Sequence, residues 1–168
     1  MAIKVNGTTV IDDSRNLVNI ASGAGGTTLV ATITMSGARE ITVSSLNLSG
    51  YTQLFFFGYG VKGQNYYDFV HIRDSGDSTN GYNRIARIQN LDSVEQGYFG
   101  GVIDLNTGMG FCGSSVIDGN YSTQVSVNNF TNGGLDTGIT TSTTSIVMGH
   151  TEGNNGNFSA GTVKLYGA

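Results

Sequence analysis

The chain carries a net charge of −4 on 168 residues, and its eight lysines and arginines are scattered along the sequence. Nucleic-acid binding needs a basic patch and a membrane span needs a long apolar stretch, so we expect no nucleic-acid and no membrane partner. Residues 1–20 lack the basic and apolar regions of a secretory signal, which predicts a protein made in a cytoplasm.

The residue types favour strands over helices. The 26 glycines and the many Thr, Ser and Asn residues are poor helix formers. A chain of this length buries roughly 70% of the surface that its unfolded form exposes, which is enough for one domain with its own core. We therefore predict an all-β fold.

The first segment, "IKVNGTTVIDDSRNLVNI", predicts a short β-hairpin. Asn6-Gly7 suits a two-residue turn in which both positions have positive φ, and Ile3 and Val5 would then pair with Val10 and Ile11. Residues 21–26, "ASGAGG", have the composition of a flexible linker. We interpret residues 1–20 as an attachment arm. Its candidate contact residues are Ile3, Val5, Val10, Ile11 and Ile20.

From residue 27 to residue 168, short runs of alternating apolar and polar residues are separated by glycine-rich turns, as in a β-sandwich. The alternation in "FVHIR" places Phe69, His71 and Arg73 on one face and Val70 and Ile72 on the other. These runs predict an antiparallel two-sheet sandwich of jelly-roll kind. The predicted strands are residues 27–35, 39–46, 51–61, 67–73, 82–91, 98–105, 122–130, 141–150 and 161–167.

The closing run, "GTVKLYG", predicts a strand in the middle of a sheet. Both of its edges would then be hydrogen-bonded, and the ring of Tyr166 would be buried with its hydroxyl at the rim.

Motifs for catalysis and cofactors are weak. Residues 58–63, "GYGVKG", lack the Lys-Ser/Thr ending of a phosphate loop, so their glycines indicate a bulge or bend. Cys112 is the only cysteine, and the two histidines, His71 and His150, fall in no metal-ligand motif. A lone thiol without a base beside it is expected to be a small buried apolar residue. We therefore predict a protein that is not an enzyme and needs no cofactor.

The loop "RDSGDSTNGY" brings three oxygen ligands close together in sequence. Asp74, Asp77 and Asn80 are evenly spaced, and calcium binds such oxygens. The spacing differs from that of an EF-hand, and Asx-rich turns commonly cap backbone amides. We therefore favour a polar turn over a metal site.

The tyrosines are the best candidates for contact with a partner. A tyrosine offers a wide apolar face and one hydroxyl at low entropic cost, and aromatic rings beside Asn and Asp also suit sugars. Half or more of these same rings are expected to fill the core or a subunit interface instead. The candidate contact residues are Tyr51, Tyr59, Tyr66, Tyr67 and Tyr82.

Both ends and the centre of the chain resemble virion proteins of tailed phages, especially cyanophages. The opening segment "IKVNGTTVIDDSRNLVNI" resembles one that introduces tail-fibre and related modules. The end, "NFSAGTVKLYGA", and the central "YTQLFFFGYGVKGQNYYDFVHIRDSG" are similar to parts of small β-sandwich modules in tail-fibre and head-decoration proteins. The sequence shows no further repeats and no coiled-coil shaft. The resemblance therefore implies a compact virion component, with the homotrimeric state usual for these modules.

The implied function is a structural role in the virion, with assembly in the host bacterial cytoplasm. The protein would decorate or cement the capsid, or serve as a tail-fibre or adhesin module that contacts other virion proteins and a host-surface glycan. The arm could add a strand to a neighbour, and many copies would strengthen a weak single contact. The alternative is a free, lectin-like carbohydrate-binding module, and a polysaccharide depolymerase is a third hypothesis.

Overall fold

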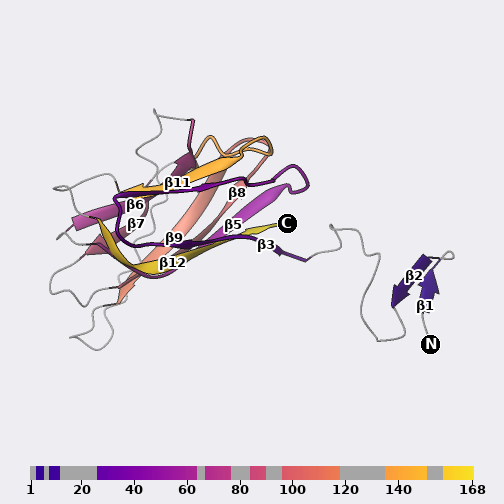
Figure 1. Cartoon of the computed structure of the whole chain (residues 1–168), viewed down its shortest axis with the longest axis horizontal. Helices are drawn as coiled ribbons and strands as arrows, with labels where there is room; N and C mark the ends of the chain where they lie inside the picture. Colours follow the sequence, from indigo (N-terminus) through magenta and orange to yellow (C-terminus); the bar gives the residue numbers. More distant parts are fainter. Residues whose placement is uncertain are drawn as a thin grey trace.

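Two antiparallel sheets stacked face to face form the body of the structure (Figure 1). The computed structural model describes residues 3–5, 8–11, 26–63, 67–76, 84–89, 96–117, 135–150 and 157–168. The six-stranded sheet contains, in spatial order, β10 (Leu135–Asp136), β9 (Met109–Ile117), β8 (Gln96–Asp104), β5 (Gln53–Gly63), β12 (Phe158–Gly167) and β3 (Thr28–Thr34). The four-stranded sheet contains β4 (Glu40–Ser44), β11 (Ser145–His150), β6 (Tyr67–Asp74) and β7 (Arg84–Gln89).

The strand order is that of a jelly roll. Successive strands from β3 to β6 alternate between the two sheets, and β7 and β8 again lie in different sheets. The order β3-β12-β5-β8 therefore faces β4-β11-β6-β7, and β9 and β10 extend the larger sheet beyond β8. The predicted antiparallel two-sheet sandwich is confirmed.

Most predicted strands are present, and two observed strands, β9 and the two-residue β10, were not predicted. The predicted segments correspond to β3 through β8, β11 and β12, while segment 122–130 lies outside the described residues. The longer of the two is β9, where Gly110 and Gly113 interrupt the apolar pattern, and β10 is too short to show any alternation. Gly110 is required at its position, since an added Cβ would lie 2.4 Å from the carbonyl oxygen of Val102 on the neighbouring strand.

The N-terminal segment forms the predicted hairpin from β1 (Ile3–Val5) and β2 (Thr8–Ile11), which make a sheet of their own (Figure 1). Of the predicted pairings, Ile3 lies opposite Ile11, because the register shifts between Ile3 and Lys4. Val5 lies opposite Thr8, the position that a two-residue connection gives it, and so pairs with neither Val10 nor Ile11. Ile20 and residues 21–25 of the predicted linker lie outside the described residues.

The core lies between the two sheets and is built from alternate residues of each strand. On β5, Leu54 and Phe56 point inward and are fully buried, as are Val70 and Ile72 on β6 of the facing sheet. Burying a side chain of this size contributes roughly 1.5–3 kcal/mol to folding. Val70 and Ile72 share one face of β6, as predicted, and the structure makes this the inward face; His71, on the opposite face, is also buried.

The C-terminal strand β12 lies within the larger sheet, between β5 and β3, as predicted. Val163 and Leu165 are fully buried in the core. The prediction for Tyr166 was wrong, because its ring is only half-buried and lies on the opposite face of the sheet, in edge contact with Phe57 at 6.0 Å between centroids. The carbonyl oxygen of Ala168 accepts backbone hydrogen bonds from Thr52 (2.7 Å) and Gln53 (3.0 Å), so β12 is held to its last residue.

A bulge occurs where the sequence predicted one. The register of β5 against β8 shifts between Gly58 and Val61, and Gly60 has a φ of 59°. On the neighbouring β12, Gly161 has a φ of 123°, and a Cβ there would lie 2.5 Å from the Cα of Val61. Gly161 thus needs both a positive φ and the absence of a Cβ, and only glycine provides the two together. The strands β5 and β12 therefore bend together at this end of the sheet.

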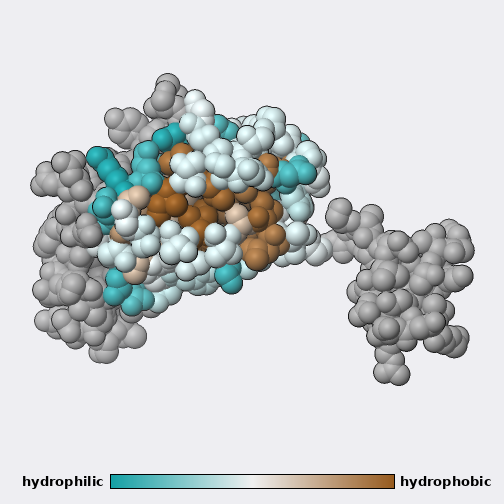
Figure 2. All heavy atoms as spheres, viewed as in Figure 1, coloured by the Kyte–Doolittle hydropathy of each residue, from teal (hydrophilic) through white to brown (hydrophobic). Residues whose placement is uncertain are grey.

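The two sheets are open along the edge formed by β3 and β4. Each of these strands is the last of its sheet. Figure 2 shows this side of the molecule, with hydrophobic residues gathered in a band between two rims of intermediate to hydrophilic residues. The partly buried apolar side chains that pack against the core here are Val30, Ala31, Ile41 and Val43. The core is therefore least well covered along this edge.

Candidate functional site

Large exposed apolar side chains collect on one surface, the outward face of the six-stranded sheet, which we call the outer face. Inward and outward residues alternate along a strand, so the sequence neighbours of a buried residue point to the outer face, and the register shift in β3 turns Leu29 to the same side as its partner Tyr166. All the large apolar side chains that are well exposed among the described residues lie on the outer face: Leu29 (51%), Phe57 (37%), Tyr59 (48%), Met109 (42%) and Phe111 (69%).

The strand register aligns several of these side chains into one continuous line, the apolar row. Tyr166 lies opposite both Leu29 and Phe55. Val102 lies opposite both Phe55 and Phe111. The apolar row therefore crosses five adjacent strands, from β3 to β9, without a polar interruption.

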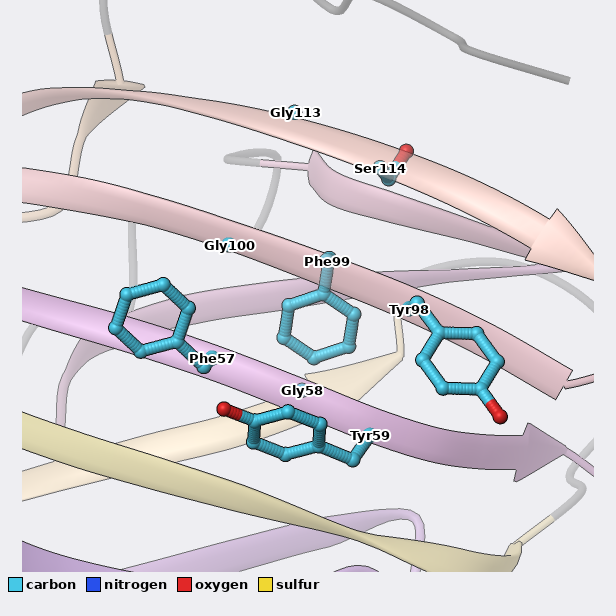
Figure 3. A pocket seen from close by; sticks show the side chains of 8 residues that line it. All are labelled: Phe57, Gly58, Tyr59, Tyr98, Phe99, Gly100, Gly113 and Ser114. Atoms are coloured by element: carbon cyan, nitrogen blue, oxygen red, sulfur yellow. The ribbon is translucent and has the colours of Figure 1, made fainter. Parts of the chain in front are cut away.

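Beside the apolar row lies an open hollow of about 300 Å³ (Figure 3). Its lining residues are Phe57, Gly58, Tyr59, Tyr98, Phe99, Gly100, Gly113 and Ser114. Gly100 and Gly113 are opposite each other on β8 and β9, and they leave the backbone bare between the rings. A Cβ on Gly113 would have no atom within 4 Å, whereas a Cβ on Gly100 would lie 3.0 Å from the Phe57 ring.

The hollow offers few polar groups. The Tyr98 hydroxyl donates a hydrogen bond of 3.0 Å to Oε1 of Gln96, and Ser114 is buried. The Tyr59 hydroxyl is the remaining side-chain polar group among the lining residues. The hollow therefore matches an apolar, ring-sized group better than a strongly polar one.

No protein-family model, no curated protein and no solved structure matches this chain. Within the described residues, no helix is long and apolar enough to cross a membrane.

The predicted contact tyrosines fall in different places. Tyr59 borders the hollow on the outer face. Tyr51 is half-buried and packs against the core, close to Gly167, where an added Cβ would lie 2.4 Å from its ring. Tyr67 is the first residue of β6, but its side chain is not described. Tyr66 and Tyr82 lie outside the described residues.

The loop that follows β6, where the sequence offers Asp74, Asp77 and Asn80, begins with Asp74 capping a backbone amide. Asp74 Oδ1 accepts a hydrogen bond of 2.7 Å from the backbone of Gly76, and Asp74 Oδ2 accepts one from the Thr143 hydroxyl. These are the contacts of a polar turn. Asp77 and Asn80 lie outside the described residues, and within the described part no three His, Cys, Asp or Glu side chains form a metal-binding group.

A second polar cluster lies on the outward face of the four-stranded sheet. Glu40 on β4 is 3.5 Å from Nη2 of Arg73 and 3.8 Å from Nε2 of the buried His71, both on β6. Gly149 of β11 lies between them, and a Cβ there would be 2.7 Å from the His71 ring. The glycine therefore makes room for the imidazole, and the cluster links three strands of the smaller sheet.

Cys112 is buried on β9, as predicted, and burial raises the pKa of its thiol to about 11. Only the thiolate reacts with alkylating reagents. At pH 8 the thiolate fraction falls from about one in ten, at the ordinary value of 9.0, to about one in a thousand. We expect iodoacetamide to label the native protein at least about 100-fold more slowly than the urea-unfolded protein. Equal rates for the two states would contradict the buried placement.

The residues that define the hollow were mostly not predicted. Tyr98 and Phe111 each precede a glycine by two positions, in "YFG" and "FCG". On a strand this spacing places a ring beside a bare stretch of backbone on the same face. The repeat of this spacing on two neighbouring strands was the available signal.

Proposed function

We propose that this protein is a non-enzymatic structural component of a tailed-phage virion, either a capsid decoration protein or a tail-fibre or adhesin module. Its outer face would contact protein partners, and the hairpin of β1 and β2 would attach it to a neighbour. The observation that carries the proposal is the collection of exposed apolar side chains on a single sheet face.

Physical argument supports an assembly role for that face. Monomeric soluble proteins rarely expose large contiguous apolar patches, and such patches mark sites of protein association. The apolar row spans five strands and includes Phe111, which is 69% exposed. The sequence resemblance supplies the kind of assembly, a phage particle built from many copies.

Sedimentation with phage particles tests the proposal. The purified chain is mixed with heads and, separately, with tails of a tailed phage that encodes it, after their accessory proteins have been removed. We expect saturable co-sedimentation with one of the two, and loss of that binding on deletion of residues 1–20. The deletion variant should keep its sandwich, because the hairpin forms a separate sheet. A chain that sediments with neither particle would contradict the virion role.

The second candidate is a carbohydrate-binding module, and the hollow is the observation that favours it. Aromatic rings of Phe57, Tyr59 and Tyr98 surround it, and sugars stack on such rings (Figure 3). A free sugar-binding module would keep its full affinity for host polysaccharide after residues 1–20 are removed. This result separates it from a protein that needs the arm for its function.

A further inference from the structure

We propose that the outer face pairs with the outer face of a second copy of the chain, with Phe111 of each copy inserted into the hollow of the other. This inference rests on the proposed assembly role and names the partner of the same surface. Three features of the face support it: a protruding ring, a hollow of matching character, and charges placed symmetrically about the apolar row.

Phe111 and the hollow form a knob and a hole on one surface. Phe111 is 69% exposed, more than any other large apolar side chain among the described residues. Gly113, the next outward position along β9, is in the floor of the hollow. Because the knob stands beside its own hole, it can fill only the hole of another molecule. A face that carries both is self-complementary, as a two-fold interface requires.

The hollow suits a phenylalanine ring. Its volume of about 300 Å³ is at the small end of the range for ligand pockets, and its walls are the rings of Phe57, Tyr59 and Tyr98. Aromatic pairs gain stability from tilted and edge-to-face contacts. A sugar would need several hydrogen-bond partners, and the Tyr98 hydroxyl already donates to Gln96.

Two charges lie at opposite positions about Phe55 in the apolar row. Lys164 on β12 lies opposite Phe57. Relative to Phe55 it is therefore displaced by one strand towards β3 and by two residues towards the C-terminal end of β5. Asp104 on β8 lies opposite Gln53. Relative to Phe55 it is displaced by one strand towards β10 and by two residues towards the N-terminal end of β5. A two-fold axis perpendicular to the line joining these charges places each Lys164 over Asp104 of the partner subunit.

The same axis brings the knob to the hole. Strands are about 4.8 Å apart, and residues rise about 3.4 Å along each strand. With these two spacings, the line from Phe111 to the hollow is almost parallel to the line from Asp104 to Lys164. The midpoint of the line from Phe111 to the hollow also lies on the two-fold axis. One operation therefore satisfies two ring contacts and two ion pairs.

Sedimentation equilibrium of the full chain tests the inference, with two single variants and their mixture. Phe111→Ala removes the knob, and Gly113→Leu fills the hole at a position where a Cβ meets no atom. We expect a dimer for the wild type, in place of the homotrimer that the sequence resemblance implies, and about 30-fold or more weaker association for each variant. Thr42→Ala, an exposed change on β4 of the other sheet, is the control that should not alter the mass.

The mixture keeps the test decisive even if each variant is monomeric. In a mixed dimer, the Phe111 of the Gly113→Leu chain enters the open hole of the Phe111→Ala chain, and the opposite contact places leucine against alanine. We therefore expect the mixture to associate at least about tenfold more tightly than either variant alone. A mixture no tighter than its components would overturn the inference.

Two other outcomes would also overturn it. A trimeric wild type would exclude the two-fold arrangement, and saturable binding of glucose or galactose at the hollow by a monomer would assign the hollow to sugar. Neither outcome bears on co-sedimentation with phage particles, so the proposed function and this inference can fail separately.

Discussion

Replacing Phe56 with alanine is expected to destabilise the fold by about 3–5 kcal/mol. Phe56 is fully buried at the centre of β5, and its ring lies 6.4 Å from that of Phe99. The neighbouring strand has Gly101 opposite it, so no other side chain can close the cavity from that side. Urea unfolding at a fixed protein concentration measures the loss.

Phe57→Ala is the matched control, because it makes the same truncation one residue further along the same strand. Phe57 points to the outer face and remains 37% exposed, with the Tyr166 ring as its edge contact. We expect a loss of about 1 kcal/mol, the scale of one aromatic pair. Equal losses for the two variants would contradict the assignment of inward and outward faces on β5.

Gly101→Ala is expected to destabilise the protein by about 2–3 kcal/mol, although it adds only one methyl group. A Cβ at Gly101 would lie 2.4 Å from the carbonyl oxygen of Phe111 and 2.4 Å from the ring of Phe56. The backbone of β9 cannot move away without breaking its pairing with β8. The shift should be visible as a lower melting temperature with unchanged far-ultraviolet circular dichroism below the transition.

Gly113→Ala provides the control for that substitution. Gly113 is on the adjacent strand, also without a positive φ, but its Cβ would meet no atom within 4 Å. We expect a change of stability within about 0.5 kcal/mol. If Gly113→Ala were as destabilising as Gly101→Ala, glycine content alone, and not the close approach of β9, would explain the effect.

The sandwich could be predicted because apolar and polar residues alternate along its strands with a period of two. Alternation along "FVHIR" predicts that Val70 and Ile72 share a face, and both are fully buried. A final strand in the middle of a sheet could also be predicted from the alternation of "GTVKLYG", and β12 lies between two strands with Val163 and Leu165 in the core. Each of these inferences needs only the residues of one strand.

The outer face could not be predicted in the same way. Its apolar row and its hollow exist only because the register aligns β3, β12, β5, β8 and β9. For the segment around Phe111 the sequence predicts only the burial of Cys112, and not the exposed ring beside it. The prediction that the Tyr166 ring is buried fails for a related reason. A shift of one residue decides whether a side chain on a strand points inward or outward, and Tyr166 is one residue from the buried Leu165.

Hydroxyl-radical footprinting of the intact chain tests most directly whether the outer face is the assembly surface. Oxidation of Phe57, Tyr59 and Phe111 would be quantified by mass spectrometry at low and high protein concentration and in the particle-bound state. We predict that these exposed side chains become strongly protected on assembly, while Met109, at the margin of the face, changes less. Equal oxidation of Phe111 in the dispersed and assembled protein would contradict the account.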